Sequence, residues 1–257
     1  MPFRRTSIDS NQRTGFYSPK RSRVVGSRQV AATDPDFANV SLLLPFDGTN
    51  GGTTFTDASS NAFVGTANGN AQISTTDPKF GTGCLLLDGT GDFISYSHNA
   101  ALSIDNVFTI EAWVRFDVFN ADYTNTILSK WGAGAVANDE FILYYDNSAN
   151  QLKFEYRDSN GSTYHAVASS TVSLSTGTYY WLAVSRNGSS WTFNVNGTTS
   201  TATNSSAINN PGIYDLMIGR LGGYSLYDLS AKIDELRLTK GVARDISSVP
   251  SAAFPTS

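Results

Sequence analysis

The most constraining feature of the 257-residue chain is a hairpin pattern at residues 178–199, TYYWLAVSRNGSSWTFNVNGTT. Two runs of alternating residues flank Asn187 and Gly188, and Asn-Gly in that setting favours a type I′ turn because both residue types tolerate positive φ. Three apolar side chains of the second run share one face: Trp191, Phe193 and Val195. The pattern predicts an antiparallel sheet with one face in a core.

Short apolar runs separated by Gly, Ser, Thr and Asn continue along the chain, and no long stripe of helical period interrupts them. We predict strands at residues 40–46, 84–88, 92–97, 107–117, 125–131, 140–146, 151–157, 162–169, 178–186, 190–196, 214–220 and 231–239. Turn signals at residues 89–91 and 158–161 recur at hairpin spacing. The expected fold is all-β, with two packed antiparallel sheets.

Charge divides the chain into a basic arm and an acidic body. Residues 1–36 carry seven Lys and Arg against three Asp, a balance of +4, whereas the remainder carries eleven against nineteen acidic residues, a balance of −8. The arm is too polar to bury a core of its own, so it is either a solvated tail or a segment ordered by a partner. Residues expected to bind that partner are Phe3, Arg4, Arg5, Arg13, Phe16, Tyr17, Lys20, Arg21 and Arg23. An acidic protein surface and nucleic acid both remain open as partners.

Four segments, in this order, resemble the laminin-G-like branch of the concanavalin A-like lectin/glucanase jelly rolls. They are KFGTGCLLLDGTGDFI (79–94), FTIEAWV (108–114), LMIG (216–219) and AKIDELRLTKGVAR (231–244). The resemblance implies a jelly-roll sandwich over residues 37–244, with an extended N-terminal arm at 1–36 and an extended tail at 245–257. That fold hosts lectins, hydrolases and structural modules, so it does not fix a function.

The closing segment, from Asp234 to Arg244, is similar to versions found in bacteriophage virion proteins. This implies a non-enzymatic virion protein, made in the bacterial host cytoplasm. The first expectation is a multicopy or oligomeric capsid decoration or cement protein, anchored to the major capsid protein through the arm and the tail. A receptor-binding tail or fibre component and a free carbohydrate-binding lectin are the alternatives.

The sequence gives little sign of export or of redox chemistry. No apolar stretch near Met1 has the length of a signal peptide, and no later run has membrane-spanning length. Cys84, the single cysteine, lies in an apolar run and is expected to pack as a small hydrophobic residue.

Catalytic patterns are also missing from the sequence. A glycosidase of this fold needs two carboxylates on one strand face, but Glu155 and Asp158 are three residues apart and point to opposite faces. His98 and His165 have no companion residues for a zinc site or a nucleophilic triad, and we expect them in turns or at the surface. The chain is therefore not expected to be an enzyme.

Two kinds of binding site remain as candidates. The resemblance implies that a structural calcium ion is possible, and Asp57 and Asp234 match the places where its ligands fall; alternatively, Asp57 caps a turn. Aromatic residues expected in loops are candidate platforms for a cell-surface glycan, with packing within the sheets as the alternative: Tyr123, Trp131, Tyr145, Tyr164, Tyr224 and Tyr227.

Overall fold

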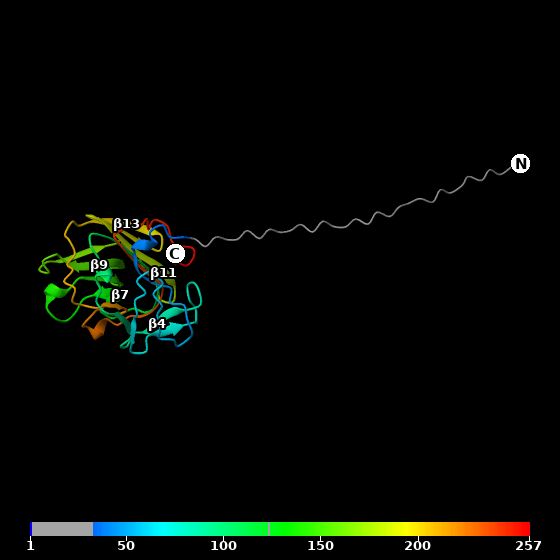
Figure 1. The fold of residues 1–257 in the computed structure, drawn as a ribbon, viewed down its shortest axis with the longest axis horizontal. Coiled ribbons are helices and arrows are strands. Elements are labelled where there is room, and N and C mark those ends of the chain that lie inside the picture. The colour runs from blue at the N-terminus through cyan, green and yellow to red at the C-terminus, as the bar shows by residue number, and fades with distance from the viewer. Residues whose placement is uncertain (2–32, 123) are drawn as a thin grey trace. The chain divides into compact units, whose positions relative to one another are not determined.

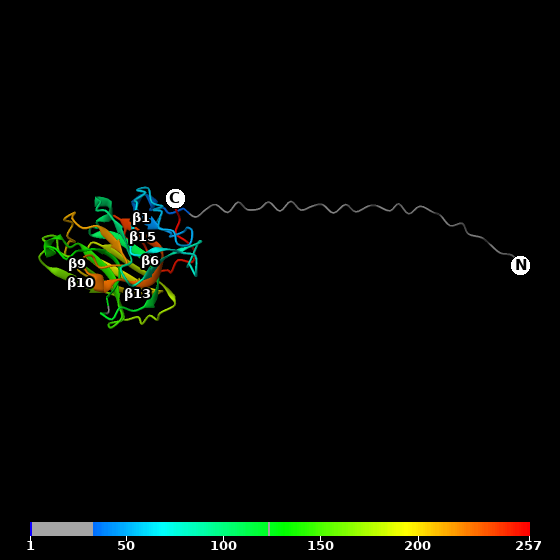
Figure 2. The same ribbon diagram turned by 90° about the horizontal axis from the view of Figure 1, so that it is seen from below.

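The computed structural model describes residue 1 and residues 33–122 and 124–257. The described residues form fifteen β-strands in two antiparallel sheets, and their only helical elements are four single 3-10 turns. Figures 1 and 2 show the sheets as two layers packed face to face. This architecture confirms the predicted all-β jelly-roll sandwich. The nine arm residues expected to bind a partner, from Phe3 to Arg23, lie outside the described residues.

The larger sheet has eight strands, and the long strand β15 is at its centre. The strand order is β13 (Thr198–Thr203), β12 (Ser190–Val195), β11 (Tyr179–Asn187), β6 (Val107–Val118), β15 (Ser230–Lys240), β4 (Cys84–Asp88) and β3 (Gln72–Ser74). A further strand, β1 (Val40–Leu44), pairs with the second half of β15. Strands from both ends of the chain therefore meet in this sheet.

The smaller sheet has seven strands. Their order is β10 (Tyr164–Ala168), β9 (Gln151–Arg157), β8 (Phe141–Asp146), β7 (Thr124–Lys130), β14 (Leu216–Ile218), β5 (Phe93–Tyr96) and β2 (Thr66–Asn68). Consecutive strands β7 to β10 form a meander, so neighbouring strands in this part of the sheet are also neighbours in sequence. Side chains that alternate along these four strands face either the core or solvent.

The core lies between the two sheets and follows the alternation read from the sequence. One face of β6 enters it with Phe108, Ile110, Ala112, Val114 and Phe116, and β12 contributes Trp191, Phe193 and Val195. Aromatic rings from both sheets meet there, since the rings of Phe154 and Trp191 lie 5.1 Å apart and those of Phe108 and Phe154 5.3 Å apart. Cys84 is fully buried and free, as expected.

All twelve predicted strands are present, within a few residues at their ends, but three short strands were not predicted. β2 and β3 have three residues each, too few to show alternation. β13 has the sequence TTSTAT, in which alanine is the one apolar residue. Such a polar sequence predicts a loop rather than a strand. β13 is an edge strand, and edge strands are often polar.

The predicted type I′ turn at Asn187 and Gly188 is wrong in its position. Asn187 pairs with Ser190 as the last residue of β11, and of the two loop residues only Gly188 has positive φ, at 63°, which is the pattern of a type II′ turn. The type I′ pattern occurs at the next Asn-Gly pair, between β12 and β13, where Asn196 has φ 49° and Gly197 has φ 98°. The two identical dipeptides therefore make different turns.

The two other turn signals also differ in outcome. Asp158 to Gly161 joins β9 to β10 as a hairpin, with Gly161 at φ 67°. Residues 89–91, predicted to make a hairpin, instead connect β4 in the larger sheet to β5 in the smaller one. Turn residues at hairpin spacing do not distinguish a hairpin from a crossing between sheets, because both reverse the chain direction.

Residues 241–257 have no regular secondary structure and pack on the outer face of the larger sheet. Ile246 and Val249 contact Trp113, Trp181 and Ala183, and Phe254 contacts the exterior side of β1 at Val40 and Leu43. The segment is also bonded to the sheet, since Asn194 Nδ2 donates to the Ile246 carbonyl oxygen over 2.7 Å and the Phe254 amide donates to Glu235 Oε2 over 2.8 Å. The predicted C-terminal tail is thus part of the body.

Asp34, which was placed in the arm, also belongs to the body. Its amide donates to the carbonyl oxygen of Ser257 over 2.8 Å, and its carboxylate accepts two hydrogen bonds of 2.8 Å from Arg244. Arg237 bonds to both Asp34 and Glu111, which completes a network of four charged side chains, of which all but Arg244 are buried. These ion pairs move the start of the body from residue 37 to residue 33 or 34.

Candidate functional site

The outer face of the seven-stranded sheet carries a group of aromatic side chains. Strand alternation places Ile142 and Tyr144 of β8 on this face, beside Glu155 and Arg157 of β9. The loop after β7 adds Trp131, and the loop after β14 adds Leu221 and Tyr227, which all pack on Ile142 and Tyr144. We call the group of Trp131, Tyr144, Tyr164, Leu221, Tyr224 and Tyr227 the aromatic face.

Two tyrosines at the ends of the aromatic face present their rings to solvent. Tyr164 is 45% exposed and contacts Trp131 edge-on, with ring centroids 6.3 Å apart. Tyr224 is 41% exposed and contacts Tyr227 in the same way at 6.1 Å. Between them Trp131 and Tyr144 are buried. Each exposed ring is thus supported by a less exposed one, Tyr164 by Trp131 and Tyr224 by Tyr227, an arrangement suited to stacking against an apolar ligand surface.

Two glycines allow the two loops of the aromatic face to approach each other closely. A Cβ on Gly222 would lie 1.8 Å from the carbonyl oxygen of Trp131, and one on Gly223 would lie 2.2 Å from the amide of Ala133. Both contacts are impossible for any other residue, so the two loops touch backbone to backbone. This close approach sets the spacing between Trp131 and the 224–227 turn.

Polar groups lie among the rings. The hydroxyl of Tyr144 donates to Glu155 Oε1 over 2.5 Å, and burial together with this hydrogen bond raises the pKa of Tyr144. The guanidinium of Arg157 lies 5.4 Å from the ring centroids of both Trp131 and Tyr164. A carboxylate and a guanidinium beside exposed rings are the kinds of group that orient sugar hydroxyls in a binding site.

A buried ion pair supports the strand that leads to Trp131. Lys130 Nζ lies 3.2 Å from Glu140 Oε1, and neither side chain is exposed. The ammonium also donates to Ser103 Oγ over 3.1 Å and lies 2.9 Å from His98 Nδ1, which accepts in the neutral tautomer. Burial lowers the pKa of Lys130 and raises that of Glu140. His98 is therefore a partner of a buried lysine, and it lies partly exposed in the loop after β5, in keeping with the expected turn or surface position.

The predicted sugar-binding residues fall into different places. Tyr224 and Tyr227 lie on the aromatic face, as does Tyr164, whereas Trp131 is only 7% exposed and supports the face from beneath. Tyr145 is fully buried in the core against Phe116 and Phe119, so it cannot contact a ligand. Tyr123 lies outside the described residues.

Sequence reasoning missed Tyr144, Glu155 and Arg157 as members of the site. A signal for two of them was available, because the correctly predicted strand at 151–157 alternates and must present Glu155 and Arg157 on the same face. Nothing in the sequence shows that the loops after β7 and β14 meet over that strand pair. That contact depends on the order of strands in the sheet.

The two candidate calcium ligands bond to different segments. Both oxygens of Asp57 already accept hydrogen bonds, from the amides of Leu43, Ser59 and Phe63 and from the Ser59 hydroxyl, all within 3.0 Å. Four donors pointed at one carboxylate fit the turn-capping alternative and do not fit a cation. Asp234 accepts from the amides of Lys79 and Phe80. Within the described residues no group of three or more His, Cys, Asp or Glu has metal-binding geometry, and calcium binding stays a prediction of the sequence.

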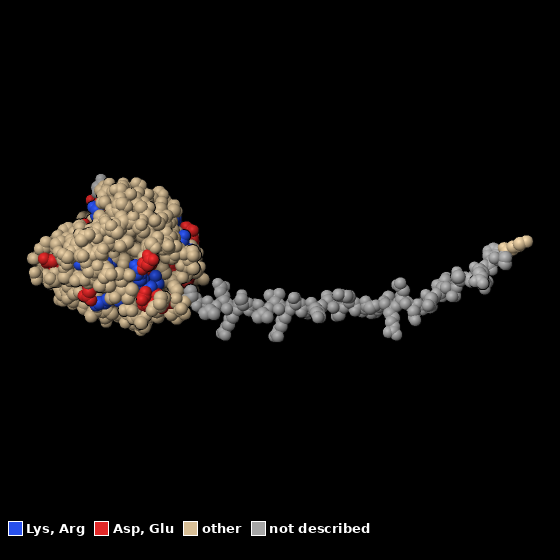
Figure 3. Space-filling model, turned by 90° about the horizontal axis from the view of Figure 1, so that it is seen from above, with Lys and Arg blue, Asp and Glu red and all other residues tan. Residues whose placement is uncertain are grey.

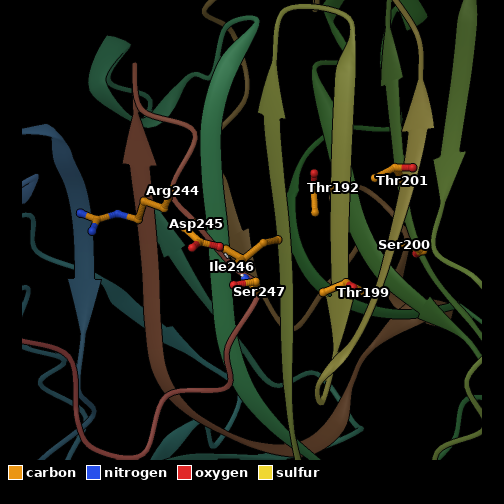
Figure 4. Close-up of a pocket in the computed structure, with 8 residues that line it drawn as sticks. All are labelled: Thr192, Thr199, Ser200, Thr201, Arg244, Asp245, Ile246 and Ser247. Carbon is orange, nitrogen blue, oxygen red and sulfur yellow. Dashed lines mark hydrogen bonds between the residues drawn. The ribbon is translucent and has the colours of Figure 1, made fainter.

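A hollow lies on the opposite side of the sandwich from the aromatic face, between β12, β13 and residues 244–247. It has a volume of about 450 Å³, and its lining consists of Thr192, Thr199, Ser200, Thr201, Arg244, Asp245, Ile246 and Ser247. Figure 4 shows the Arg244 side chain pointing away from the threonines, in keeping with its ion pair to Asp34. The hollow offers hydroxyl groups but no aromatic ring, so it lacks a stacking surface.

Charged side chains are sparse over the body. On the face drawn in Figure 3, basic and acidic groups lie in small, mixed clusters between wide uncharged areas. A nucleic-acid-binding surface requires a continuous basic patch, which this face does not have. Among the described residues, no helix has the length and apolar character needed to cross a membrane.

Comparison with known proteins agrees with the fold. A family model described as the concanavalin A-like lectin/glucanases superfamily matches residues 88–244. Domain 4 of a GH43 extracellular arabinanase from Geobacillus stearothermophilus, solved in complex with arabinotriose, is similar in structure with a TM-score of 0.60 at 20% identity, covering 82% of this chain and 96% of that one. No curated protein sequence matches the chain.

Two larger solved structures contain a similar sandwich. The binding domain of Paraclostridial Mosquitocidal Protein 1 aligns with a TM-score of 0.63 at 14% identity over 81% of this chain. Trypanosoma rangeli sialidase, in complex with sialic acid, aligns with a TM-score of 0.53 at 17% identity over 79% of this chain. The alignments span 50% and 31% of those chains, so this chain corresponds to one part of each. At these identities the likeness concerns the fold alone.

Proposed function

The chain belongs to the concanavalin A-like lectin/glucanase superfamily, and from this premise we propose that it is a non-enzymatic module that binds glycans through its aromatic face. The observation that carries the proposal is the pair of exposed rings: Tyr164 packs on the buried Trp131, and Tyr224 packs on the half-buried Tyr227. Sugars present apolar C–H faces that stack on such rings, and their hydroxyls bond to nearby carboxylate and guanidinium groups. Glu155 and Arg157 supply those groups.

The placement of the glutamates supports a binding role over hydrolysis. Three of the four are buried and bonded within the fold: Glu111 to Arg237, Glu140 to Lys130, and Glu235 to the Phe254 amide. Only Glu155 lies beside the aromatic face, where it accepts from Tyr144. Hydrolysis by two carboxylates about 5–10 Å apart needs a second accessible acid of suitable geometry.

Glycan binding is tested with an immobilised glycan array and the variants Tyr164→Ala and Tyr224→Ala. We expect each variant to lose at least tenfold in affinity while melting close to the wild type, because more than two-fifths of each residue is already exposed to solvent. Tyr214, which packs against the Gly132 backbone, offers a control: Tyr214→Phe should bind normally. Full binding by the double variant Tyr164→Ala/Tyr224→Ala would refute the assignment of the aromatic face.

We also propose that the module is displayed on a virion as a capsid decoration protein, with a tail or fibre component as the alternative location. Support comes from the closing sequence segment, from the seven basic residues of the arm, and from the use of residues 241–257 within the body, which leaves the arm as the anchor. The described body begins at Thr33 and Asp34 on the outer side of the eight-stranded sheet. An anchor there would leave the opposite, aromatic face free for a host glycan.

The display proposal is tested by removing residues 1–32, since a cut after residue 36 would also remove Asp34 and break its ion pairs with Arg237 and Arg244. We expect the shortened chain to fold normally but to be absent from purified particles. Incorporation at normal copy number would place the anchor within the body.

A further inference from the structure

Arg157 stands out on the aromatic face because one of its donors, the buried Nε, has no hydrogen-bond partner among the described residues. Its ion-pair partner is Asp139, whose Oδ2 lies 3.7 Å from Nε, beyond hydrogen-bond distance. The side chain is 17% exposed, so part of it is open to solvent and ligands.

The neighbouring carboxylates are already bonded to other groups. Asp139 accepts from the Gly132 amide over 3.2 Å, and burial raises its pKa. Glu155 accepts from the Tyr144 hydroxyl. Asp139 therefore forms an ion pair with Arg157 without a hydrogen bond to its Nε, and Glu155 is bonded to Tyr144. A buried donor without a partner is uncommon in folded proteins and calls for an acceptor.

Two adjacent rings and two backbone hydrogen bonds position Arg157. Its guanidinium lies over both Trp131 and Tyr164, and the backbone of Arg157 is bonded at both ends of the residue, to the Glu140 carbonyl oxygen and the Asn209 amide. A guanidinium held in this way loses little conformational entropy when it binds a planar acid. Its fork of N–H groups matches a carboxylate or a sulfate in bidentate geometry.

We propose that the aromatic face selects acidic glycans, and that Arg157 binds the carboxylate or sulfate group of a sugar whose ring stacks on Tyr164. This inference rests on the proposed glycan-binding function and adds a ligand class to it. The body as a whole is acidic, so long-range attraction does not assist such a ligand, and the selectivity must come from short-range contacts at Arg157.

The test uses the full chain and three glycans that share one backbone: lactose, 3′-sialyllactose and lactose 3′-sulfate. Calorimetry should show that the wild type binds one or both acidic glycans at least tenfold more tightly than lactose; which of the two binds identifies carboxylate or sulfate as the ligand. Arg157→Gln should remove that preference, because it lowers the affinity for the acidic glycan at least tenfold more than it lowers the affinity for lactose. Arg157→Lys should keep part of the preference, because it retains the charge but not the fork.

Lys153→Gln is the matched control, since Lys153 lies on the same face of β9 but is bonded to Asp146 over 2.7 Å. It removes one positive charge and should leave the preference for acidic glycans unchanged. If the wild type binds lactose and the acidic glycans equally, or if Arg157→Gln and Lys153→Gln reduce the preference equally, the inference fails while glycan binding stands. If a wider array with matched neutral and acidic members shows no binding at all, both proposals fail. Thermal melts of each variant exclude unfolding as the cause.

Discussion

The two outer faces of the sandwich carry similar residues but differ in what covers them. On the eight-stranded sheet Trp113 and Trp181 are 3% and 1% exposed, because Phe80, Ile246 and Val249 of the same chain pack on them. On the seven-stranded sheet the aromatic face is left open at Tyr164 and Tyr224, which are 45% and 41% exposed. One face is closed within the chain, and the other is available to a ligand.

The cation–π contacts of the two outer faces also differ. Lys79 Nζ lies 3.9 Å from the Trp113 ring centroid on the closed face, where a loop covers the indole. Arg157 makes a similar contact with Trp131 on the open face, with its guanidinium 5.4 Å from the ring centroid, and its buried Nε has no hydrogen-bond partner among the described residues. A basic side chain thus packs on a tryptophan on each face, but only on the open face is that tryptophan followed by exposed tyrosine rings.

Removing residues 245–257 should have the largest effect on stability, because it would expose the closed outer face of the eight-stranded sheet. Burial of Ile246 and Phe254 is worth about 1.5–3 kcal/mol each, and Glu235 would lose the Phe254 amide at a cost of about 1–3 kcal/mol. We expect a loss of about 4–9 kcal/mol, comparable to the whole stability of a domain. Urea denaturation measures it, with deletion of residues 1–32 as a control that should change the stability little. Equal stability of the two truncations would mean that the C-terminal segment does not close the sheet.

A pair of single substitutions compares the faces directly. Trp181→Ala should lower the free energy of unfolding by about 3–5 kcal/mol, since it removes a fully packed indole. Tyr164→Ala should cost less than about 1 kcal/mol, since nearly half of the ring is already in solvent. Equal losses in thermal or urea melts would contradict the assignment of one closed and one open face.

The closed face should also make stability depend on pH. Burial is the main cause that raises the pKa of both Asp234 and Glu235 to about 7. Since each folded-state pKa lies above its unfolded value, the folded chain binds more protons between about pH 4 and 7, and stability falls as the pH rises through that window. We expect a loss of about 2–4 kcal/mol between pH 5 and pH 8, measured by urea denaturation.

Glu235→Gln should reduce the loss of stability between pH 5 and pH 8, because an amide does not titrate. Asp234→Asn should reduce it for the same reason. The two carboxyls are adjacent, so the effects of the two substitutions need not add. A wild-type stability that is constant or rises between pH 5 and pH 8 would show that neither carboxyl retains its proton in the folded state.

Alternation along single strands was enough to predict the sandwich and most of its core. The apolar side of β6 enters the core as predicted, because a residue's face depends only on its own strand. The sequence could not show that the opposite side, with Glu111 and Trp113, is also buried, since residues 245–257 cover it from more than a hundred residues away. Contacts at such separation leave no local signal in one sequence.

The sequence predicted an aromatic stacking surface, but it did not predict all the residues that form it. Aromatic residues in the loops pointed to a stacking surface, and Tyr224 and Tyr227 are in it. Tyr145 was misplaced because its strand, 141–146, is apolar on both faces, so its sequence does not show which side enters the core. Arg157 was missed because the sequence does not show which side chains surround an arginine on a strand. Only the structure shows that its Nε is buried beside the rings of Trp131 and Tyr164, without a hydrogen-bond partner in the described part of the chain.

The smallest expected effect is that of a metal chelator, and it separates turn capping from calcium binding at Asp57. Because four donors already occupy the Asp57 carboxylate, we expect EDTA to leave the melting temperature unchanged, whereas Asp57→Ala should cost about 2–4 kcal/mol through the loss of these bonds. A structural calcium ion held at a hundred times its dissociation constant would instead contribute about 2.7 kcal/mol, or several degrees. A melting temperature that EDTA lowers, that added Ca²⁺ restores and that becomes insensitive to EDTA in Asp234→Asn would establish the calcium site and overturn the capping interpretation.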